Sequence, residues 1–338
     1  MKINFEHLQS AHCENGVTQS LLKNIGVHQI TEPLAFGIGS GLFFVYIPLL
    51  KINNGPVIAF RTLPGQIFKR TCQELDIQVV RKKFTSKKQA ETFLNECLGS
   101  GHPVGCQVGV YYLPYFPKEY RFHFNAHNII VYGHEEDKYL VSDPVMENVA
   151  TLSSYELERV RFTKGLLAPK GQIYFPKTHA IVTEEKIKKA IRSGIKKNAN
   201  NMLQIPVPIV GVNGIKYTGN RIKKWRDKLG LKQAGLYLAQ LVRMQEEIGT
   251  GGGGFRYIYG AFLQEAHAYH PIDALLEISN MFTQSGDLWR SAAVQASGIY
   301  KGRIGSQEDF NVIGDYLLEI AEIERKAFLG LSKINWRT

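Results

Sequence analysis

Residues 12–26 read HCENGVTQSLLKNIG. Apolar residues at Val17, Leu21 and Leu22 recur with helical spacing, and Gly26 ends the pattern. The stretch therefore predicts a short amphipathic helix that begins at a cysteine.

Cys13 stands where a thiol becomes a nucleophile. Exposed N–H groups and the positive end of the helix dipole favour thiolate over thiol at a helix N-terminus. The same N–H groups can receive the oxyanion that forms when a thiolate attacks a carbonyl. A small residue that merely fills the first turn is the alternative interpretation, but the polar neighbours of Cys13 favour function. The other three cysteines stand in apolar patterns and are expected to be buried free thiols: Cys72, Cys97 and Cys106.

A nucleophilic thiol needs a base, and His127 is the best candidate. It precedes an apolar strand predicted over 128–132, which a polar turn joins to a second strand over 138–142. Asp143 ends that second strand, so an antiparallel hairpin can bring it beside His127. A carboxylate on one imidazole nitrogen would leave the other nitrogen facing the sulfur. A satisfied polar residue at a strand end and a turn cap are the alternative interpretations of the two residues.

The composition is that of an ordinary globular protein. The 338 residues are 44% hydrophobic and 21% charged, which suffices for a sizeable core and favours two domains. A net charge of +11 attracts acidic partners in general. Without zinc-finger spacing or an RNA-binding aromatic signature, neither a metal site nor nucleic acid is expected. No apolar stretch approaches the roughly 20 residues that span a bilayer, and the polar start excludes a signal peptide, so we expect a cytoplasmic protein with no membrane partner.

The pattern of predicted elements changes about half-way along the chain. Short helices and short apolar strands alternate in the first half, including a strand at 57–60, whereas the second half has helical periodicity throughout. We therefore predict an α+β domain over 1–178 and a mostly α-helical domain over 179–338. The segment PKTHAIVTEE (176–185) is the expected linker.

Taken together, these motifs resemble a known family. The order of a helix that starts with cysteine, a strand that starts with histidine and a strand that ends in Asp-Pro is similar to that of bacteriocin-processing and other papain-like cysteine peptidases. HCENGVTQSLLKNIG, FGIGSGLFF, HNIIVYG and Asp-Pro more closely resemble the N-terminal domain of the butirosin biosynthetic acyltransferase family. GTGGGGFRYIYGAFLQEA resembles the signature of the helical C-terminal domain in that family, so the resemblance covers most of the chain.

The resemblance implies a papain-like fold whose thiol site transfers acyl groups rather than cutting peptides. In that family an aminoacyl group leaves the phosphopantetheine thioester of an acyl carrier protein and becomes an amide on an aminoglycoside amine, during antibiotic biosynthesis. Cys13 would be the nucleophile, His127 the general base and then acid, and Asp143 the orienting group. Many of the peptidases carry an oxyanion glutamine six residues before the cysteine, where this chain has His7. The oxyanion donor is therefore assigned to the Cys13 N–H, with Gln9 as a second candidate.

The glycine run of the second domain has two interpretations. It lacks the Lys-Ser/Thr ending of a P-loop, so nucleotide hydrolysis is not expected. It is either a flexible hinge or the wall of a substrate or phosphopantetheine channel facing Cys13, because glycines let N–H groups approach an anion at a helix N-terminus. The channel would be lined by Gly251, Gly252, Gly253, Gly254 and Arg256. Glu265 either binds a substrate amine or lies on an exposed helical face.

The sequence thus predicts a two-domain cysteine acyltransferase, with a catalytic domain followed by a helical domain that shapes the acceptor site. The donor would be a carrier-protein or pantetheine thioester and the acceptor a small amine, with no tightly bound cofactor. A basic stretch within 186–197 is either a solvated face or a docking surface for the acidic carrier protein. Two alternatives stay open: a papain-like cysteine peptidase or amidase, and a non-catalytic binding protein of the same fold. A homo-oligomer is also open.

Overall fold

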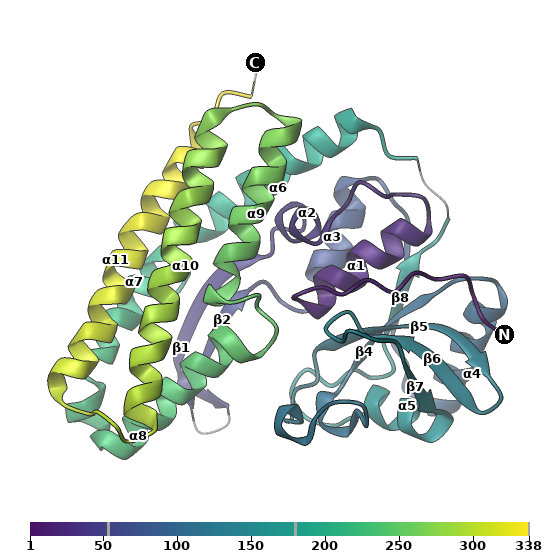
Figure 1. Ribbon diagram of the computed structural model, residues 1–338, viewed down its shortest axis with the longest axis horizontal. Helices are drawn as coiled ribbons and strands as arrows, with labels where there is room; N and C mark the ends of the chain where they lie inside the picture. The colour runs from purple at the N-terminus through teal and green to yellow at the C-terminus, as the bar shows by residue number, and fades with distance from the viewer. Residues whose placement is uncertain (53–54, 179–180, 337–338) are drawn as a thin grey trace. The chain divides into compact units, whose positions relative to one another are not determined.

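The computed structural model describes residues 1–52, 55–178 and 181–336, and the chain divides into two compact units (Figure 1). Unit 1 comprises residues 1–35 and 67–183, and unit 2 comprises residues 36–66 and 184–338. No helix in the described part of the chain is both long and apolar enough to cross a membrane.

This division differs from the linear one expected from sequence. The chain leaves unit 1 at residue 36, returns at residue 67 and leaves again at residue 184. The two early strands, which we assigned to the N-terminal domain, therefore belong to the unit that holds the C-terminal helices. Their apolar side chains pack there, as the ring contacts of Phe44 and Phe60 with Trp289 show. Residues 179–180 of the expected linker lie outside the described residues.

Unit 1 is built on a six-stranded antiparallel sheet of order β3-β8-β4-β5-β6-β7. The strands are β3 (Val79–Lys82), β4 (Val104–Val108), β5 (His127–Glu135), β6 (Lys138–Ser142), β7 (Ala150–Ser153) and β8 (Ile173–Pro176). The predicted hairpin is β5–β6. Strands β3 and β7 were not predicted, because both are edge strands whose residues are mostly not buried and form no continuous apolar run.

The two faces of this sheet carry different helices. The α-helices that lie wholly or partly in the described residues of unit 1 are α1 (Cys13–Asn24), α2 (Glu32–Ile38), α3 (Gln66–Glu74), α4 (Lys87–Gly99) and α5 (Ser154–Arg161). One face forms an apolar core with α4 and α5, to which Cys106, Ile129 and Ile173 contribute. Since side chains alternate along a strand, the neighbouring positions point to the other face, and α1 packs against β4, β5 and β8.

Unit 2 is mostly helical, as predicted. Strands β1 (Leu42–Ile52) and β2 (Gly55–Arg61) form an antiparallel pair. The helices are α6 (Glu184–Leu203), α7 (Gly211–Ile222), α8 (Trp225–Val242), α9 (Arg256–Tyr269), α10 (Asp273–Tyr300) and α11 (Gln307–Ser332). The molecule is therefore an α+β protein, with a first unit built on an antiparallel sheet and a mostly helical second unit.

Candidate active site

The N-terminus of α1 is fixed by side chains that bind its backbone. His12 is the N-cap residue, and its ring accepts a hydrogen bond from the N–H of Asn15 at 3.3 Å. The carboxylate of Glu32 accepts from the N–H groups of Ala11 and His12, at 3.0 and 2.7 Å. Cys13 follows as the first helical residue, so its N–H has no acceptor within the helix. The predicted placement of the sulfur at a helix N-terminus is confirmed.

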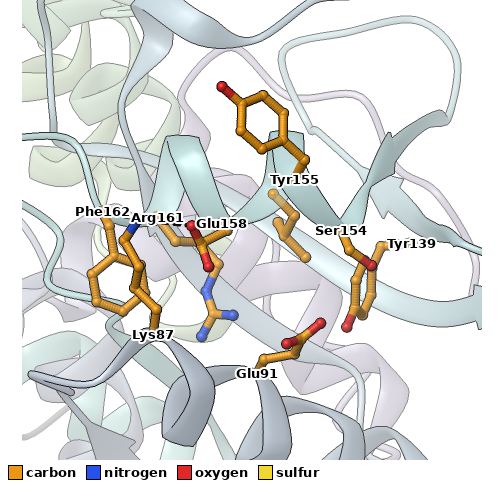
Figure 2. A pocket seen from close by; sticks show the side chains of 9 residues that line it. Lys87, Glu91, Tyr139, Ser154, Tyr155, Glu158, Arg161 and Phe162 are labelled. Atoms are coloured by element: carbon orange, nitrogen blue, oxygen red, sulfur yellow. Dashed lines mark hydrogen bonds and ion pairs between the residues drawn. The ribbon is translucent and has the colours of Figure 1, made fainter.

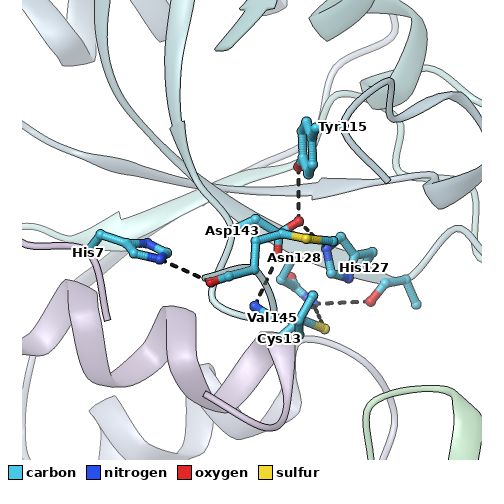
Figure 3. Close-up of polar contacts among 9 residues, drawn as sticks. His7, Cys13, Tyr115, His127, Asn128, Asp143 and Val145 are labelled. Atoms are coloured by element: carbon cyan, nitrogen blue, oxygen red, sulfur yellow. Dashed lines mark hydrogen bonds and ion pairs between the residues drawn. The ribbon is translucent and has the colours of Figure 1, made fainter. Parts of the chain in front are cut away.

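The predicted hairpin brings His127 and Asp143 together. His127 opens β5 and Asp143 follows the last residue of β6, and their side chains meet with His127 Nε2 at 2.7 Å from Asp143 Oδ2 (Figure 3). Cys13 lies near enough to raise the pKa of His127, and Nδ1 is the ring nitrogen that Asp143 leaves for the sulfur. The structure thus joins the three residues in the predicted order: sulfur, imidazole, carboxylate.

The surroundings of His127 favour its charged form. Burial alone would lower the pKa of His127, but the Coulombic interactions with Asp143 and Cys13 and the hydrogen bonds to both outweigh burial and raise this pKa to about 10. The imidazole is therefore protonated at neutral pH. The charged form of the imidazole places a positive charge beside the sulfur, as the site of a nucleophilic cysteine requires.

Asp143 is held by two further donors that the sequence did not reveal. Its side chain is fully buried, and it accepts from the Tyr115 hydroxyl at 2.9 Å and from the Val145 N–H at 3.2 Å. Burial and the neighbouring carboxylate raise the pKa of Tyr115 well above its usual value, so the phenol stays a donor. Phe116 packs edge-on against the ring of His127. Tyr115 and Phe116 lie in the loop before β5, where an aromatic-rich sequence gives no sign of either contact.

Asn128 is a second residue that sequence reasoning missed. Its Nδ2 lies 3.8 Å from Cys13 Sγ, and the side chain is buried (Figure 3). A usable signal was present, because Asn128 is a polar residue inside the apolar strand HNIIVYG. It points to the face that carries α1, while its neighbour Ile129 points into the apolar core.

The residues before α1 do not supply the expected side-chain oxyanion donor. Gln9 is exposed, and the side-chain amide in contact with the sulfur is that of Asn128. His7 binds Ser142 Oγ at 2.8 Å and the carbonyl of Met146 at 3.1 Å, on either side of Asp143. His7 therefore binds the residues that flank Asp143. The prediction for Gln9 is corrected accordingly.

The glycine run of unit 2 packs within its own unit. The N–H groups of Gly252 and Gly253 are taken by Thr250 Oγ1 and Glu246 Oε1, both at 3.1 Å. Gly252, Gly253 and Gly254 are buried, whereas Gly251 is exposed. All four have positive φ, from 55° to 86°, so the run is a tight packed turn and the hinge interpretation does not fit the buried part.

Arg256 has a structural role in place of the expected substrate contact. It is fully buried and forms two hydrogen bonds to the carboxylate of Glu324, at 2.8 and 2.9 Å, and one to the carbonyl of Gly254 at 2.7 Å. A guanidinium so closed off from solvent cannot bind a substrate anion, and that prediction is wrong for this residue. Glu265 is partly buried on α9, and its role toward an amine stays a prediction.

A separate pocket of about 160 Å³ lies in unit 1 among residues of α4, β6 and α5 (Figure 2). Tyr139 and Arg161 line it, and Lys87 and Glu158 form a 2.7 Å ion pair in its wall. It is lined by no cysteine or histidine.

Comparison with known proteins identifies the family. Residues 155–331, more than half of the chain, match the family described as "Domain of unknown function (DUF4872)". The chain belongs to this family. In this member of the DUF4872 family, residues 12–144 also match the family described as "Butirosin biosynthesis protein H, N-terminal". The resemblance of the N-terminal motifs to the butirosin family is thereby confirmed, and the resemblance of the C-terminal signature to that family stays a prediction.

Two further comparisons complete the picture. The fold of this DUF4872 member is similar to the crystal structure of a Bacillus anthracis protein assigned as a C39-like peptidase, with 14% identity and a TM-score of 0.36. That similarity covers 53% of this chain and 100% of the other. No curated protein matches the sequence. The segment that matches the butirosin family carries Cys13, His127 and Asp143, the residues that meet in the candidate site.

Proposed function

We propose that the protein is a cysteine-dependent acyltransferase, which moves an acyl group from a thioester donor to an amine through an acyl-Cys13 intermediate. The observation that carries the proposal is the Cys13–His127–Asp143 arrangement, in which the pKa of His127 is raised to about 10. The match of residues 12–144 to a butirosin biosynthesis protein supports transfer in antibiotic metabolism over peptide hydrolysis.

The first half of the reaction acylates the enzyme. The Cys13 thiolate attacks the thioester carbonyl, and the resulting tetrahedral oxyanion collapses as the bond to the donor sulfur breaks. His127 gives its proton to the departing thiol and becomes neutral. The free donor thiol and acyl-Cys13 are the products of this half.

The second half delivers the acyl group. A neutral amine attacks the acyl-Cys13 carbonyl and transfers a proton to His127, and the amide leaves as the bond to Cys13 Sγ breaks. The thiolate and imidazolium are restored, so the balance is thioester plus amine to thiol plus amide. Asp143 keeps Nε2 of His127 occupied, which orients Nδ1 toward sulfur in both halves.

The donor and the acceptor follow from the same proposal. A phosphopantetheine thioester on an acyl carrier protein is the donor, and a small amine is the acceptor. The net charge of +11 suits an acidic carrier protein. Lys189, Lys196 and Lys197 are exposed on α6 and are the residues we propose for docking.

Mass spectrometry of the intact protein tests the proposal. An acyl-pantetheine thioester should add one acyl group to the wild type and none to Cys13→Ser, and an added amine should remove the group as an amide. Cys97→Ser is the matched control, because burial raises the pKa of the Cys97 thiol to about 11 and its loss should leave acylation unchanged. Release by water at the same rate with and without amines would identify a hydrolase instead. No acylation by any thioester would favour a binding protein.

A further inference from the structure

The orientation of the Asn128 side chain is fixed by two partners. Its Oδ1 accepts a hydrogen bond from the Tyr174 hydroxyl at 2.7 Å, and its Nδ2 donates to the carbonyl of Ala126 at 3.1 Å. A carbonyl only accepts, so the amide nitrogen has to face Ala126. The second N–H of the amide is then directed to Cys13 Sγ, 3.8 Å from the nitrogen.

The supporting tyrosine is itself rigid. Tyr174 is 2% exposed, lies on β8 and packs against Phe68 with ring centroids 4.7 Å apart. Burial raises the pKa of Tyr174 well above its usual value, so the hydroxyl stays a donor to Asn128 over the working pH range. The amide is thus held from β8 while its backbone belongs to β5, which gives it little freedom to turn away from the sulfur.

A buried amide beside a nucleophile has a chemical use. Polar groups are seldom buried in a sheet without a partner, and among the described residues one N–H of Asn128 has the sulfur alone as its acceptor. When the sulfur bonds to a carbonyl carbon, the developing oxyanion is two bonds from Sγ. A donor at 3.8 Å from Sγ can reach that oxygen, together with the N–H of Cys13 at the start of α1.

We propose that Asn128 is the side-chain donor of the oxyanion hole at Cys13 and that Tyr174 is the residue that positions it. The inference rests on the proposed acyl chemistry and names a further catalytic residue for it. The oxyanion hole is then formed by one N–H from a helix terminus and one from a strand. The Asn128 amide takes the role that the sequence analysis assigned to Gln9 as a candidate donor.

Two reactions of the Cys13 thiol distinguish stabilisation of the oxyanion by Asn128 from an effect of Asn128 on the reactivity of the thiol itself. Alkylation by iodoacetamide is a displacement that forms no oxyanion, whereas acylation by p-nitrophenyl acetate passes through one. In the full-length protein, Asn128→Ala should lower the rate of Cys13 acylation by about 10²-fold or more. The alkylation rate should stay within a few-fold of the wild-type rate. Tyr174→Phe should lower acylation by up to about tenfold, the value of one lost hydrogen bond.

Tyr139→Phe is the matched control. Its hydroxyl donates to the Asn95 amide oxygen at 2.9 Å, so it removes a hydrogen bond of the same type in the same unit but away from Cys13. It should change neither rate. Thermal unfolding of each variant shows whether a rate loss reflects misfolding, and Tyr174→Phe preserves the packed ring if Asn128→Ala does not fold.

Each outcome decides the proposal. An equal fall of acylation and alkylation in Asn128→Ala would assign the amide to the thiolate rather than the oxyanion, and unchanged acylation would remove it from the chemistry. A wild type that is alkylated but never acylated at Cys13 would overturn the oxyanion hole as well. A wild type that is acylated but does not pass the group to amines would contradict the transferase function only.

Discussion

The two units contain buried charged pairs of similar geometry, His127–Asp143 in unit 1 and Arg256–Glu324 in unit 2, with closest distances of 2.7 and 2.8 Å. The groups around them differ. Glu324 also accepts from Ser285 and Trp289, and both members of its pair are fully buried. His127 instead has a carboxylate on one nitrogen and a thiol on the other, with 5% of its surface exposed.

This difference separates a structural pair from a chemical one. In unit 2 every strong donor and acceptor around the pair belongs to side chains and carbonyls that stay in place. In unit 1 the row of interacting groups Asp143, His127 and Cys13 ends at a sulfur that can form and break a bond. A buried charge in a motif therefore indicates function only when one of its neighbours is reactive. The predictions below test this contrast, starting with the largest expected effect.

Replacing Cys13 by serine should remove the reactive thiol and leave the fold intact. We expect acylation by a thioester to fall by about 10⁴-fold or more, since the nucleophile of a thiol site has no substitute. The small, similar side chain should change thermal unfolding little. Single-turnover mass spectrometry gives the rate and circular dichroism the unfolding temperature. A variant that still acylated rapidly would place the nucleophile on another cysteine.

Asp143→Asn should keep the geometry and remove the charge that supports His127. We expect thioester acylation to fall by about 10²–10⁴-fold, because an amide no longer favours the imidazolium or its tautomer. The dependence of the acylation rate on pH tests the protonation of His127 directly. In the wild type the acylation rate should fall as the pH rises through about 10, where the imidazolium of His127 is lost.

Without the carboxylate the pKa of His127 is less raised, so this upper limb should move to lower pH in Asp143→Asn. Tyr115→Phe is the graded control, because it removes one hydrogen bond to the carboxylate and keeps its charge. It should move the limb less than Asp143→Asn does. An upper limb that stayed in place in both variants would show that Asp143 does not set the protonation of His127.

In unit 2 the corresponding change should affect stability and not chemistry. Glu324→Gln leaves the buried Arg256 without its charge partner, which typically costs about 3–5 kcal/mol of unfolding free energy. Replacing both residues, as in Arg256→Met with Glu324→Leu, should cost less than the single change because no unpaired charge remains. Denaturant unfolding measures both, and iodoacetamide labelling of Cys13 in the folded fraction should keep its wild-type rate. A slower labelling rate in Glu324→Gln would mean that the pair contributes to the thiol site.

The contrast also explains what sequence reasoning reached and where it stopped. The positions of Cys13, His127 and Asp143 follow from a local helix signal and a hairpin signal, both of which are short-range. Asn128 and Tyr174 meet through pairing of β5 and β8 with β4, whose partners are far apart in sequence. No local pattern encodes the contact between them, and the only local sign was the polar Asn128 inside the apolar strand HNIIVYG.

The same limit produced the errors in unit 2. A glycine run before a helix has the same local appearance whether its N–H groups are open or satisfied. Thr250 and Glu246 satisfy two of them, and Glu324, 68 positions from Arg256, neutralises the arginine. The return of the chain to unit 1 at residue 67 is equally non-local. Packing decides all three, and the sequence pattern does not specify packing.

The smallest effect concerns the glycine run itself. Gly253 has φ of +55°, and a Cβ there would lie 2.9 Å from the Cα of Gly286. Gly302 has φ of +71°, but a Cβ there would meet nothing within 4 Å. Gly302→Ala therefore reports backbone strain alone, about 1–2 kcal/mol. Gly253→Ala should lose somewhat more unfolding free energy because α10 must also shift. The contrary result would be a Gly253→Ala variant that is no less stable than Gly302→Ala but binds an acyl-pantetheine thioester more weakly. The glycine run would then be a ligand-binding site, and its purely structural role in unit 2 would be wrong.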